Sequence, residues 1–475
     1  MCSVCTSRLL RCCFAIDVPD GRIAGQEGHS AVVSVLDPDT RYIQARVGVA
    51  RSRDRVSAPQ EARVLEVIGG ESEDPVSKIT YVKTYQVAYP LDEPLSDSIH
   101  YMPVRAALLV ELGTDDGEVG IGESAIYGGP ASVVETMIHE ELAPRILGED
   151  PTKPEWLWQV MTGRSHQHGD GGVLPAAVSG LDIAIWDLMG RTSGLPLYRL
   201  LGGYRDQVRA YASAGFYAED KDAEGLADEA RRYVEAGFRH VKIKVGRTTD
   251  TPVNPLVHMD APEFATVTLA EDLRRVGAVR KAIGDDVHLM VDANNAWTKP
   301  TALEAGREFE RLGVHWFEEP VPTDDREGSA ALAAAIDVPI AGYETRTGLA
   351  GFRDLIADRA VDIAQPDVIW SGGITACRRI AALAMAAGLP CVPHVFSTAV
   401  SLAANLHFIA SIPNSYLLEF DQNPNVLRTE LLDRPITTDE QGVVTVPNSP
   451  GLGVRLDRET LRRYAAAEPR ISEYG

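Results

Sequence analysis

The chain has 475 residues, 45% of them hydrophobic and 24% charged, which is typical of a soluble globular protein. That composition excludes a disordered chain, a collagen-like fibre and a disulfide scaffold, and at about 150 residues per domain the length fits two or three domains. With 46 Lys and Arg against 68 Asp and Glu, the net charge of −22 argues against a nucleic-acid partner, because such proteins present a basic surface.

The cysteines and the start of the chain bear on where the protein works. Four of the six cysteines fall within the first thirteen residues, and the rest of the chain has only Cys377 and Cys391. This usage is typical of a reducing compartment. No apolar run approaches the length of a membrane span, and the N-terminal apolar stretch is interrupted by Arg11 and lacks a clear cleavage site. We therefore expect a cytoplasmic protein with no membrane partner.

Residues 1–76 differ from the rest of the chain. The stretch 46–67 has no clean strand or helix period, and GGESEDP follows it with turn formers and charge. We interpret 1–76 as an extension and expect it to be mobile. A regulatory or partner-binding arm is the alternative.

Residues 77–206 predict a small α+β domain. The segment KITYVKTYQVAY alternates like a strand, and VRAALLVELGTDDGEVGIGES indicates two strands joined by a turn at 115–117. Predicted helical segments follow, notably over 174–189.

From residue 207 to 425, short apolar runs alternate with amphipathic helices. The helical segments include 222–237, 269–284 and 373–388, and each ends near a glycine. The strand candidates are 208–215, 240–246, 288–294, 315–321, 338–344, 361–368, 389–395 and 416–421. Eight strands alternating with helices predict an α/β fold with a closed parallel barrel. An open doubly wound sheet would need a Gly-rich phosphate loop after its first strand, and none is present.

Polar side chains stand at the ends of these strands, where a barrel builds its active site. Every strand from the second to the eighth ends with an ionisable residue, which solvated loops do not readily explain. These residues are Lys242 and Lys244, Asp292 followed by Asn294, Glu318 and Glu319, Glu344, Asp367, His394 and Glu419.

Three of the carboxylates predict a metal site. Asp292, Glu318 and Glu344 follow one another at intervals of 26 residues, which is one β/α unit each. Crowded carboxylates repel unless a cation lies among them, and hard oxygen ligands suit Mg²⁺. The alternative is a salt-bridged barrel carboxylate, which is the better interpretation for Glu319 because it points away from Glu318 in the strand.

Two further pairs predict acid/base groups. Lys242 and Lys244 face the same side of a strand, so we expect each to depress the pKa of the other and burial to add to this, giving a base near neutral pH. Asp367 and His394 are 27 residues apart, and a carboxylate beside an imidazole makes a second acid/base. A structural histidine is the alternative for that pair. A divalent metal between two bases suits abstraction of the proton α to a substrate carboxylate, because the metal stabilises the enediolate.

These residues resemble the enolase superfamily, and within it the mandelate racemase subgroup. The resemblance covers about 77–465 and is carried by KIK (242–244), VDANNAW (291–297), FEEP (317–320), QPDVIWSGGIT (365–375), PH (393–394) and LLEFD (417–421). It implies a modified TIM barrel, (β/α)₇β, with an N-terminal α+β capping domain and a C-terminal segment, 426–475, that packs on the cap.

The resemblance also implies roles. It makes Asp292, Glu318 and Glu344 the ligands of one Mg²⁺, Lys244 the base on one face and Asp367–His394 the dyad on the other. Lys242 would tune the base, while Lys242, Asn294 and Glu419 would contact the substrate. A Lys or His base acting with Mg²⁺ is the known pattern of this superfamily.

Two departures stand out from that pattern. Tyr343 occupies the position before the third ligand, where the family usually has Gly, and it could reshape the surroundings of the metal or the pocket wall. The extension 1–76 is not a family feature, and the loop 247–268 also looks long. A second lysine on the strand 6 side, as in the muconate lactonizing subgroup, is absent.

Both dehydration and racemisation follow from an enediolate, so the motifs leave the reaction open. Dehydration of a sugar acid to a 2-keto-3-deoxy acid is favoured, since such dehydratases are the commoner members of the subgroup. The polar cap stretches 89–101, with Asp92, Glu93 and Asp97, and 165–172 also suit a polyhydroxy acid. A racemase or epimerase of a 2-hydroxy acid and a non-catalytic relative are the alternatives. We expect a small-molecule carboxylate substrate and a homo-oligomer.

Overall fold

The computed structural model describes residues 31–36, 42–47 and 77–475, apart from 128, 164–167, 170, 220 and 248–266. Backbone contacts divide the chain into Met1–Val76 and Ser77–Gly475. In the first unit, β1 (Ala31–Leu36) pairs antiparallel with β2 (Tyr42–Val47), two strands that the sequence analysis did not assign. The rest of 1–76, which we expected to be mobile, lies outside the described residues. Most of the loop 247–268 lies outside them as well.

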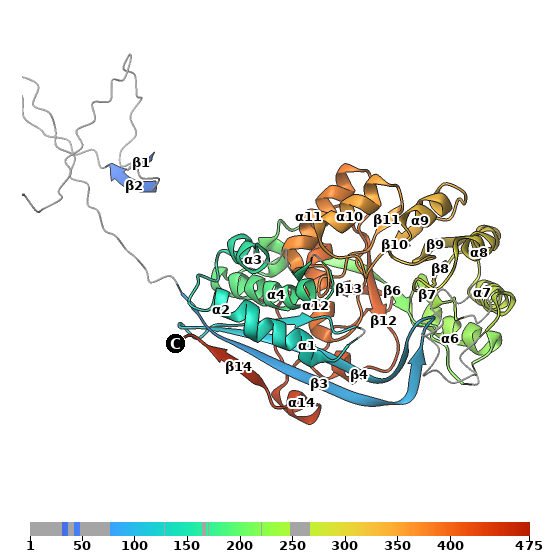
Figure 1. Ribbon diagram of the computed structural model, residues 1–475, viewed down its shortest axis with the longest axis horizontal. Coiled ribbons are helices and arrows are strands. Elements are labelled where there is room, and N and C mark those ends of the chain that lie inside the picture. Colours follow the sequence, from blue (N-terminus) through green and yellow to red (C-terminus); the bar gives the residue numbers. More distant parts are fainter. Residues whose placement is uncertain are drawn as a thin grey trace, which may run out of the picture. The chain divides into compact units, whose positions relative to one another are not determined.

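The N-terminal part of the second unit is built on an antiparallel sheet with the order β14-β3-β4-β5. Its strands are β3 (Ile79–Ser96), β4 (Tyr101–Thr114), β5 (Val119–Ser124) and β14 (Arg470–Glu473). The turn between β4 and β5 needs the positive φ of 88° that Gly117 adopts without strain. The C-terminal strand β14 pairs antiparallel with β3 and so forms the edge of this sheet, as Figure 1 shows. We call this part the cap.

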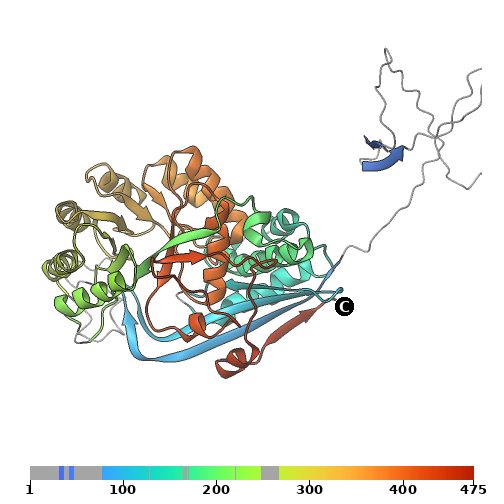
Figure 2. The same cartoon turned by 180° about the vertical axis from the view of Figure 1, so that it is seen from behind.

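Helices follow the cap sheet. They are α1 (Ala131–Thr136), the π-helical turn η1 (Met137–Leu142), α2 (Ala143–Ile146), α3 (Pro154–Thr162), α4 (Val173–Ser193) and α5 (Leu197–Leu200). They gather beside the cap sheet in both views of the molecule (Figures 1 and 2).

The rest of the second unit is built on a parallel sheet with the strand order β11-β10-β9-β8-β7-β6-β12. Its strands are β6 (Gln207–Ser213), β7 (His240–Lys244), β8 (His288–Asp292), β9 (Val314–Glu318), β10 (Ile340–Gly342), β11 (Ile363–Ala364) and β12 (Leu417–Asp421). The last strand, β12, returns to pair with the first, β6, and the antiparallel β13 (Val443–Thr445) adds to β6 as well. The predicted α/β barrel with a capping domain is confirmed.

Helices alternate with these strands, as the sequence predicts. They are α6 (Ala223–Glu235), α7 (Leu269–Ile283), α8 (Lys299–Arg311), α9 (Arg326–Ala333), α10 (Gly348–Ala357), α11 (Gly373–Ala386) and α12 (Ala399–Ser411). The short helices α13 (Val426–Thr429) and α14 (Arg458–Arg463) belong to the C-terminal segment.

The seventh predicted strand, 389–395, differs from the others. It forms a single bridge, between Cys391 and Ala364, in place of a ladder. Pro390 and Pro393 explain the difference, because proline has no N–H to donate to a neighbouring strand. The segment still runs along the barrel wall, since the N–H of Val392 donates to the carbonyl of Ala364 at 2.9 Å.

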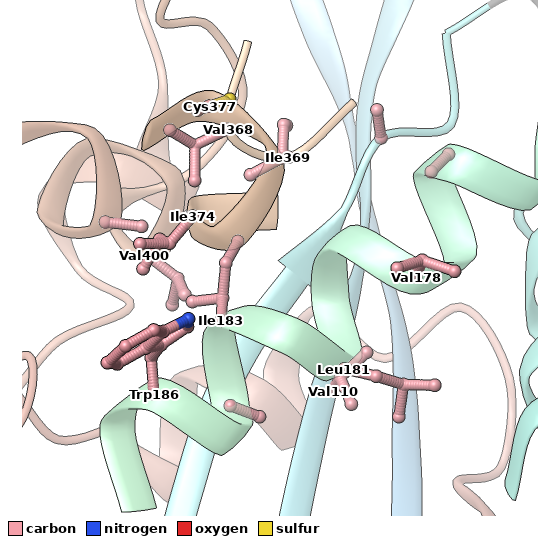
Figure 3. Close-up of a cluster of buried hydrophobic side chains, with 14 of the residues drawn as sticks. Val110, Val178, Leu181, Ile183, Trp186, Val368, Ile369, Ile374, Cys377 and Val400 are labelled. Carbon is pink, nitrogen blue, oxygen red and sulfur yellow. The ribbon is translucent and has the colours of Figure 1, made fainter. Parts of the chain in front are cut away.

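Helix α4 joins the cap to the barrel. A Cβ on Gly122 of β5 would lie 2.0 Å from the carbonyl oxygen of Gly180, so glycine at both positions lets strand and helix approach closely. On the other side, Ile183 and Trp186 of α4 face Ile374 of α11 (Figure 3). The cap and the barrel therefore share one core, which fixes their relative position.

The same helix qualifies the membrane expectation. By length and composition, α4 alone among the described residues is apolar enough to cross a membrane, although the sequence analysis found no such run. However, 83% of its apolar window is buried inside the protein, which is the environment of a core helix.

Candidate active site

The three predicted metal ligands lie at neighbouring strand ends. Asp292 and Glu318 are the last residues of β8 and β9 and stand opposite each other in the ladder, and Glu344 follows β10. Asp292 and Glu318 are buried, and only 12% of the Glu344 side chain is exposed. Parallel strands thus bring residues that are distant in sequence to one edge of the barrel.

The two lysines pair with these carboxylates. Lys242 Nζ lies 2.6 Å from Glu318 Oε1 and 3.8 Å from Asp292 Oδ2, and Lys244 Nζ lies 2.5 Å from Asp292 Oδ2. The expectation of a depressed lysine pKa is therefore wrong for the protein by itself. Burial lowers the pKa of Lys244, but Asp292, Glu344 and Asp97 together raise it by more, so that the pKa ends above its ordinary range. Burial also lowers the pKa of Lys242, and Glu318 leads the groups that outweigh it. Lysine–lysine repulsion is a smaller effect than attraction to carboxylates at these distances.

The donor set fits a hard divalent cation. All three candidate ligands are carboxylates, and Glu344 Oε2 is buried without a hydrogen-bond partner. It faces His394 Nε2 at 3.2 Å, close enough for an ion pair but without hydrogen-bond geometry. As they stand, no three His, Cys, Asp or Glu side chains within the described residues are placed to hold an ion. Instead, the lysine ammonium groups pair with Glu318 Oε1 and Asp292 Oδ2.

Asp367 and His394 form the predicted pair. Asp367 Oδ2 lies 2.8 Å from His394 Nδ1, while its other oxygen accepts the N–H of Ile369 at 3.0 Å. This contact holds the imidazole in one orientation and leaves Nε2 on the side of Glu344. Burial lowers the pKa of His394, but Glu344 and Asp367 raise it to about 10.

Glu419 and Lys242 lie beneath the other site residues. Glu419 Oε1 is 2.8 Å from Lys242 Nζ and accepts the hydroxyl of Ser213 at 2.6 Å, and its second oxygen accepts the N–H of Val395 at 2.9 Å. Burial raises the pKa of Glu419, but Lys242 and His394 lower it to about 2. Both oxygens are thus engaged, and contact of Glu419 with a substrate stays a prediction.

Sequence reasoning missed two supporting residues. Ser213 ends the first barrel strand, and a search for ionisable strand ends could not find a hydroxyl. Gln365 donates to Glu318 Oε2 at 3.0 Å. It stands in the quoted QPD motif, so its amide was a signal available in the sequence.

Glu319 has a different partner from the one expected. Within the described residues it pairs with no Lys, Arg or His, so the salt-bridge interpretation is wrong. Instead, Glu319 Oε2 accepts the side-chain amide of Asn295 at 2.7 Å, and Oε1 accepts the N–H of Glu344 at 3.0 Å. Its own φ of 44° turns the chain so that it leaves the strand direction of Glu318. Glu319 therefore orients the backbone of the third candidate ligand.

A cavity of about 610 Å³ lies between the barrel and the cap. From the barrel it is lined by Lys244, Asn294, Asn295, Glu344, Trp370, His394 and Phe396, and from the cap by Asp97 and residues 99–106. The side-chain oxygen of Asn294 is buried in this region without a partner. One cavity thus gathers a lysine, a carboxylate, an amide and a histidine.

The cap wall is less polar than expected. Asp97 and His100 line the cavity, but so do Ile99, Met102 and Pro103, and Asp92 and Glu93 do not. The second stretch, 165–172, lies partly outside the described residues. Tyr343 does not shape the cavity wall either, because its hydroxyl turns to Ser329 in α9 at 2.9 Å.

Comparisons with known proteins match this architecture. The mandelate racemase / muconate lactonizing enzyme N-terminal domain matches residues 79–202, and the enolase C-terminal domain-like family matches residues 225–460. Arabinonate dehydratase of Saccharolobus solfataricus is 37% identical over 390 residues, covering 81% of this chain and 98% of the relative. D-galactarolactone cycloisomerase of Agrobacterium fabrum is 35% identical over 403 residues, covering 82% of this chain and 100% of the relative.

A solved structure agrees with these relatives. The crystal structure of L-talarate dehydratase from Polaromonas sp. JS666, complexed with Mg and L-glucarate, has a TM-score of 0.71 and 33% identity, covering 84% of this chain and 100% of that one. The similar proteins are thus enzymes, dehydratases and a cycloisomerase, that act on small acids, and the predicted resemblance is confirmed. The chain belongs to the mandelate racemase/muconate lactonizing enzyme family of the enolase superfamily.

Proposed function

We propose that the protein is a Mg²⁺-dependent dehydratase that converts a sugar acid to a 2-keto-3-deoxy acid. One observation carries this proposal: Lys244 and His394, two groups able to carry a proton, line the same cavity as Glu344 and Asn294. The similarity to arabinonate dehydratase and L-talarate dehydratase supports the substrate class.

In this proposal Asp292, Glu318 and Glu344 hold the metal, which acts as a Lewis acid for the substrate carboxylate when bound. The unpartnered oxygen of Glu344 supports that assignment. Glu319 keeps the Glu344 backbone in place through its 3.0 Å hydrogen bond. Gln365 and the indole N–H of Trp316, each 3.0 Å from Glu318 Oε2, restrain the second ligand.

Lys244 and His394 handle the proton on carbon 2. Lys244 extends from β7 and His394 from the segment 389–395, so each approaches the substrate from its own part of the barrel wall. Asp367 orients the imidazole of His394 and stabilises its charged form. Lys242 stays in the layer beneath, where it balances the charge of Glu318 and Glu419.

Isomerisation is the second candidate, because two proton carriers on one cavity are also what a racemase, epimerase or cycloisomerase requires. The similarity to D-galactarolactone cycloisomerase favours it. Dehydration ranks first because the similar dehydratases include both a curated relative and a solved structure with Mg. The cytoplasmic location and the homo-oligomeric state stay predictions.

A substrate panel tests the proposal. Purified protein with Mg²⁺ is incubated with arabinonate, L-talarate and D-galactarolactone, and products are identified by NMR. A 2-keto-3-deoxy acid from either open-chain acid supports dehydration, whereas conversion of the lactone alone supports isomerisation. Removing divalent ions with EDTA should abolish turnover and Mg²⁺ should restore it.

A pair of variants tests the metal ligands. Glu318→Gln should weaken Mg²⁺ binding in calorimetry and lower activity with it, because a neutral amide is a poorer ligand than a carboxylate. The matched control is Glu304→Gln, which changes an exposed glutamate of α8. Full activity in metal-free protein, or unchanged Mg²⁺ binding by Glu318→Gln, would contradict the assignment.

A further inference from the structure

The turn between β3 and β4 carries a second carboxylate–imidazole pair. Asp97 Oδ2 lies 3.0 Å from His100 Nδ1, and Asp97 Oδ1 accepts the backbone N–H groups of Ile99 at 2.8 Å and His100 at 2.6 Å. Asp97 is 4% exposed, so its carboxylate is almost fully committed to this turn. The contact with Nδ1 fixes the imidazole and leaves Nε2 as the ring nitrogen that can meet another partner.

The turn is attached to the barrel at several points. Ser98 Oγ donates to the carbonyl of Ala293, just after β8, at 2.6 Å, and the carbonyl of Ser96 accepts the N–H of Tyr217 at 2.7 Å. Arg247 Nη1 donates to the carbonyl of His100 at 3.1 Å. These contacts come from separate barrel segments, so the position of His100 over the barrel is fixed before a substrate enters.

His100 shares its cavity with the catalytic candidates of the barrel. It lines the cavity together with Lys244, Glu344 and His394, and 42% of its side chain is exposed. Asp97 raises the pKa of His100 above its ordinary range, against the opposing effect of burial. Among the other charged groups that face it, Glu344 raises the pKa and Lys244 lowers it. The ion pair with Asp97 therefore favours the protonated imidazole.

We propose that His100 is a catalytic acid contributed by the cap, which protonates the 3-hydroxyl as it leaves. This inference rests on the proposed dehydration. It divides the chemistry between the two domains: barrel residues move the proton of carbon 2, and the cap supplies the proton that turns hydroxide into water.

The step balances without any further reagent. A barrel base takes the proton from carbon 2, and the C–H electron pair moves into the enediolate. That pair then forms the double bond between carbons 2 and 3 while the C3–O bond breaks and its electrons go to the oxygen. His100 Nε2–H protonates this oxygen, giving water and a neutral imidazole that regains its proton from solvent. The enol left behind becomes the 2-keto-3-deoxy acid when carbon 3 gains a proton and the enol hydroxyl on carbon 2 loses one.

A purely structural role for His100 is the competing explanation. Asp97 already accepts two backbone N–H groups, so it holds the turn without the imidazole. A structural role would also give no reason for His100 to line the cavity with much of its side chain exposed while the side chain of Asp97 is buried.

The test is His100→Gln, which keeps a side-chain donor but cannot transfer a proton. The control is His288→Gln, because His288 is an exposed histidine at the start of β8, the end of the strand opposite Asp292, and does not line the cavity. On the best substrate of the panel, His100→Gln should lower the rate of keto-acid formation by about 10²–10⁴-fold. Exchange of the carbon-2 proton in deuterated water, followed by NMR, should continue at close to the wild-type rate. The control should match the wild type in both assays.

A substrate analogue with fluorine in place of the 3-hydroxyl separates proton donation from substrate placement. Fluoride leaves without needing a proton, so His100→Gln and the wild type should eliminate it at similar rates; His100→Asn serves as a second variant if the first folds poorly. Keto-acid formation at the wild-type rate by His100→Gln overturns the acid role alone. Loss of exchange and of fluoride elimination in both variants also overturns it. A wild-type protein that forms no keto acid overturns the proposed function and this inference together.

Discussion

Replacing Lys242 by Met should destabilise the protein, because this lysine neutralises a buried cluster of acids. Its side chain has no exposed surface, and its ammonium lies 2.6 Å from Glu318 and 2.8 Å from Glu419. Methionine fills a similar volume without charge, so both carboxylates would stay buried without their cation. The expected effect is therefore electrostatic, with little change in packing.

The magnitude follows from what each carboxylate retains. Breaking a buried ion pair from one side costs about 3–5 kcal/mol. Glu318 keeps the indole of Trp316 and the amide of Gln365, and Glu419 keeps the hydroxyl of Ser213. These neutral donors offset part of the loss, so we expect about 3 kcal/mol at pH 8.

The loss should shrink in mild acid. Lys242 is the leading cause that holds the pKa of Glu419 down, at about 2, so the wild-type carboxylate stays charged at pH 5.5. Without Lys242, only His394 and Lys244 oppose the effect of burial, so the pKa of Glu419 rises and protonation relieves the buried charge as the pH falls. A raised pKa in the folded variant adds stability at low pH, which narrows the difference from the wild type.

Urea unfolding followed by tryptophan fluorescence and circular dichroism, at pH 8 and 5.5, measures the effect. The matched control is Lys281→Met, an exposed lysine of α7, which should change little. The double variant Lys242→Met/Glu419→Gln should recover part of the stability, because one of the two unpaired charges is gone. If Lys242→Met unfolds at the same urea concentration as the wild type at both pH values, the electrostatic argument is refuted.

Three other predictions concern the second base, a buried histidine and the extension. His394→Asn should lower turnover by about 10²–10⁴-fold, while Lys244 still exchanges the carbon-2 proton of one epimer. The exchange is followed by NMR in deuterated water. If both epimers exchange at the wild-type rate, His394 is not the second base. His407 Nδ1 accepts the N–H of Tyr198 at 3.0 Å, and burial lowers the pKa of His407 to about 4. The free energy of unfolding should therefore fall by about 2 kcal/mol from pH 7 to 5, because the unfolded chain binds a proton that the folded protein does not. Thermal melting of His407→Gln should show a smaller fall over the same pH range. Deleting residues 1–76 should leave turnover and melting temperature nearly unchanged, and an insoluble or inactive product would reveal a role for the extension.

The sequence by itself determined the barrel and the residues that stand around its mouth. Asp292, Glu318 and Glu344 recur at the length of one β/α unit, and parallel strands bring such positions to the same edge. The alternation in KIK placed Lys242 and Lys244 on one side, and Asp367 and His394 met for the same reason. These predictions depend only on local periodicity and on the repeated connection of strand to helix, which a sequence records directly.

Only the tertiary structure decided how those residues pair. The lysines lie closer to carboxylates of other strands than the argument from neighbouring lysines assumed, so their pKa values rise instead of falling. Electrostatic energy depends on distance and burial, and neither is written in the order of residues.

The cap shows the same limit of local pattern. His100 belongs to a turn that is distant in sequence from every barrel strand, yet it shares a cavity with Lys244 and His394. Its place there depends on Ser98 and Arg247, whose hydrogen bonds join the turn to the barrel. Such contacts form only when the shared core around α4 has set the cap on the barrel, because that packing, rather than any local preference, brings the two domains together.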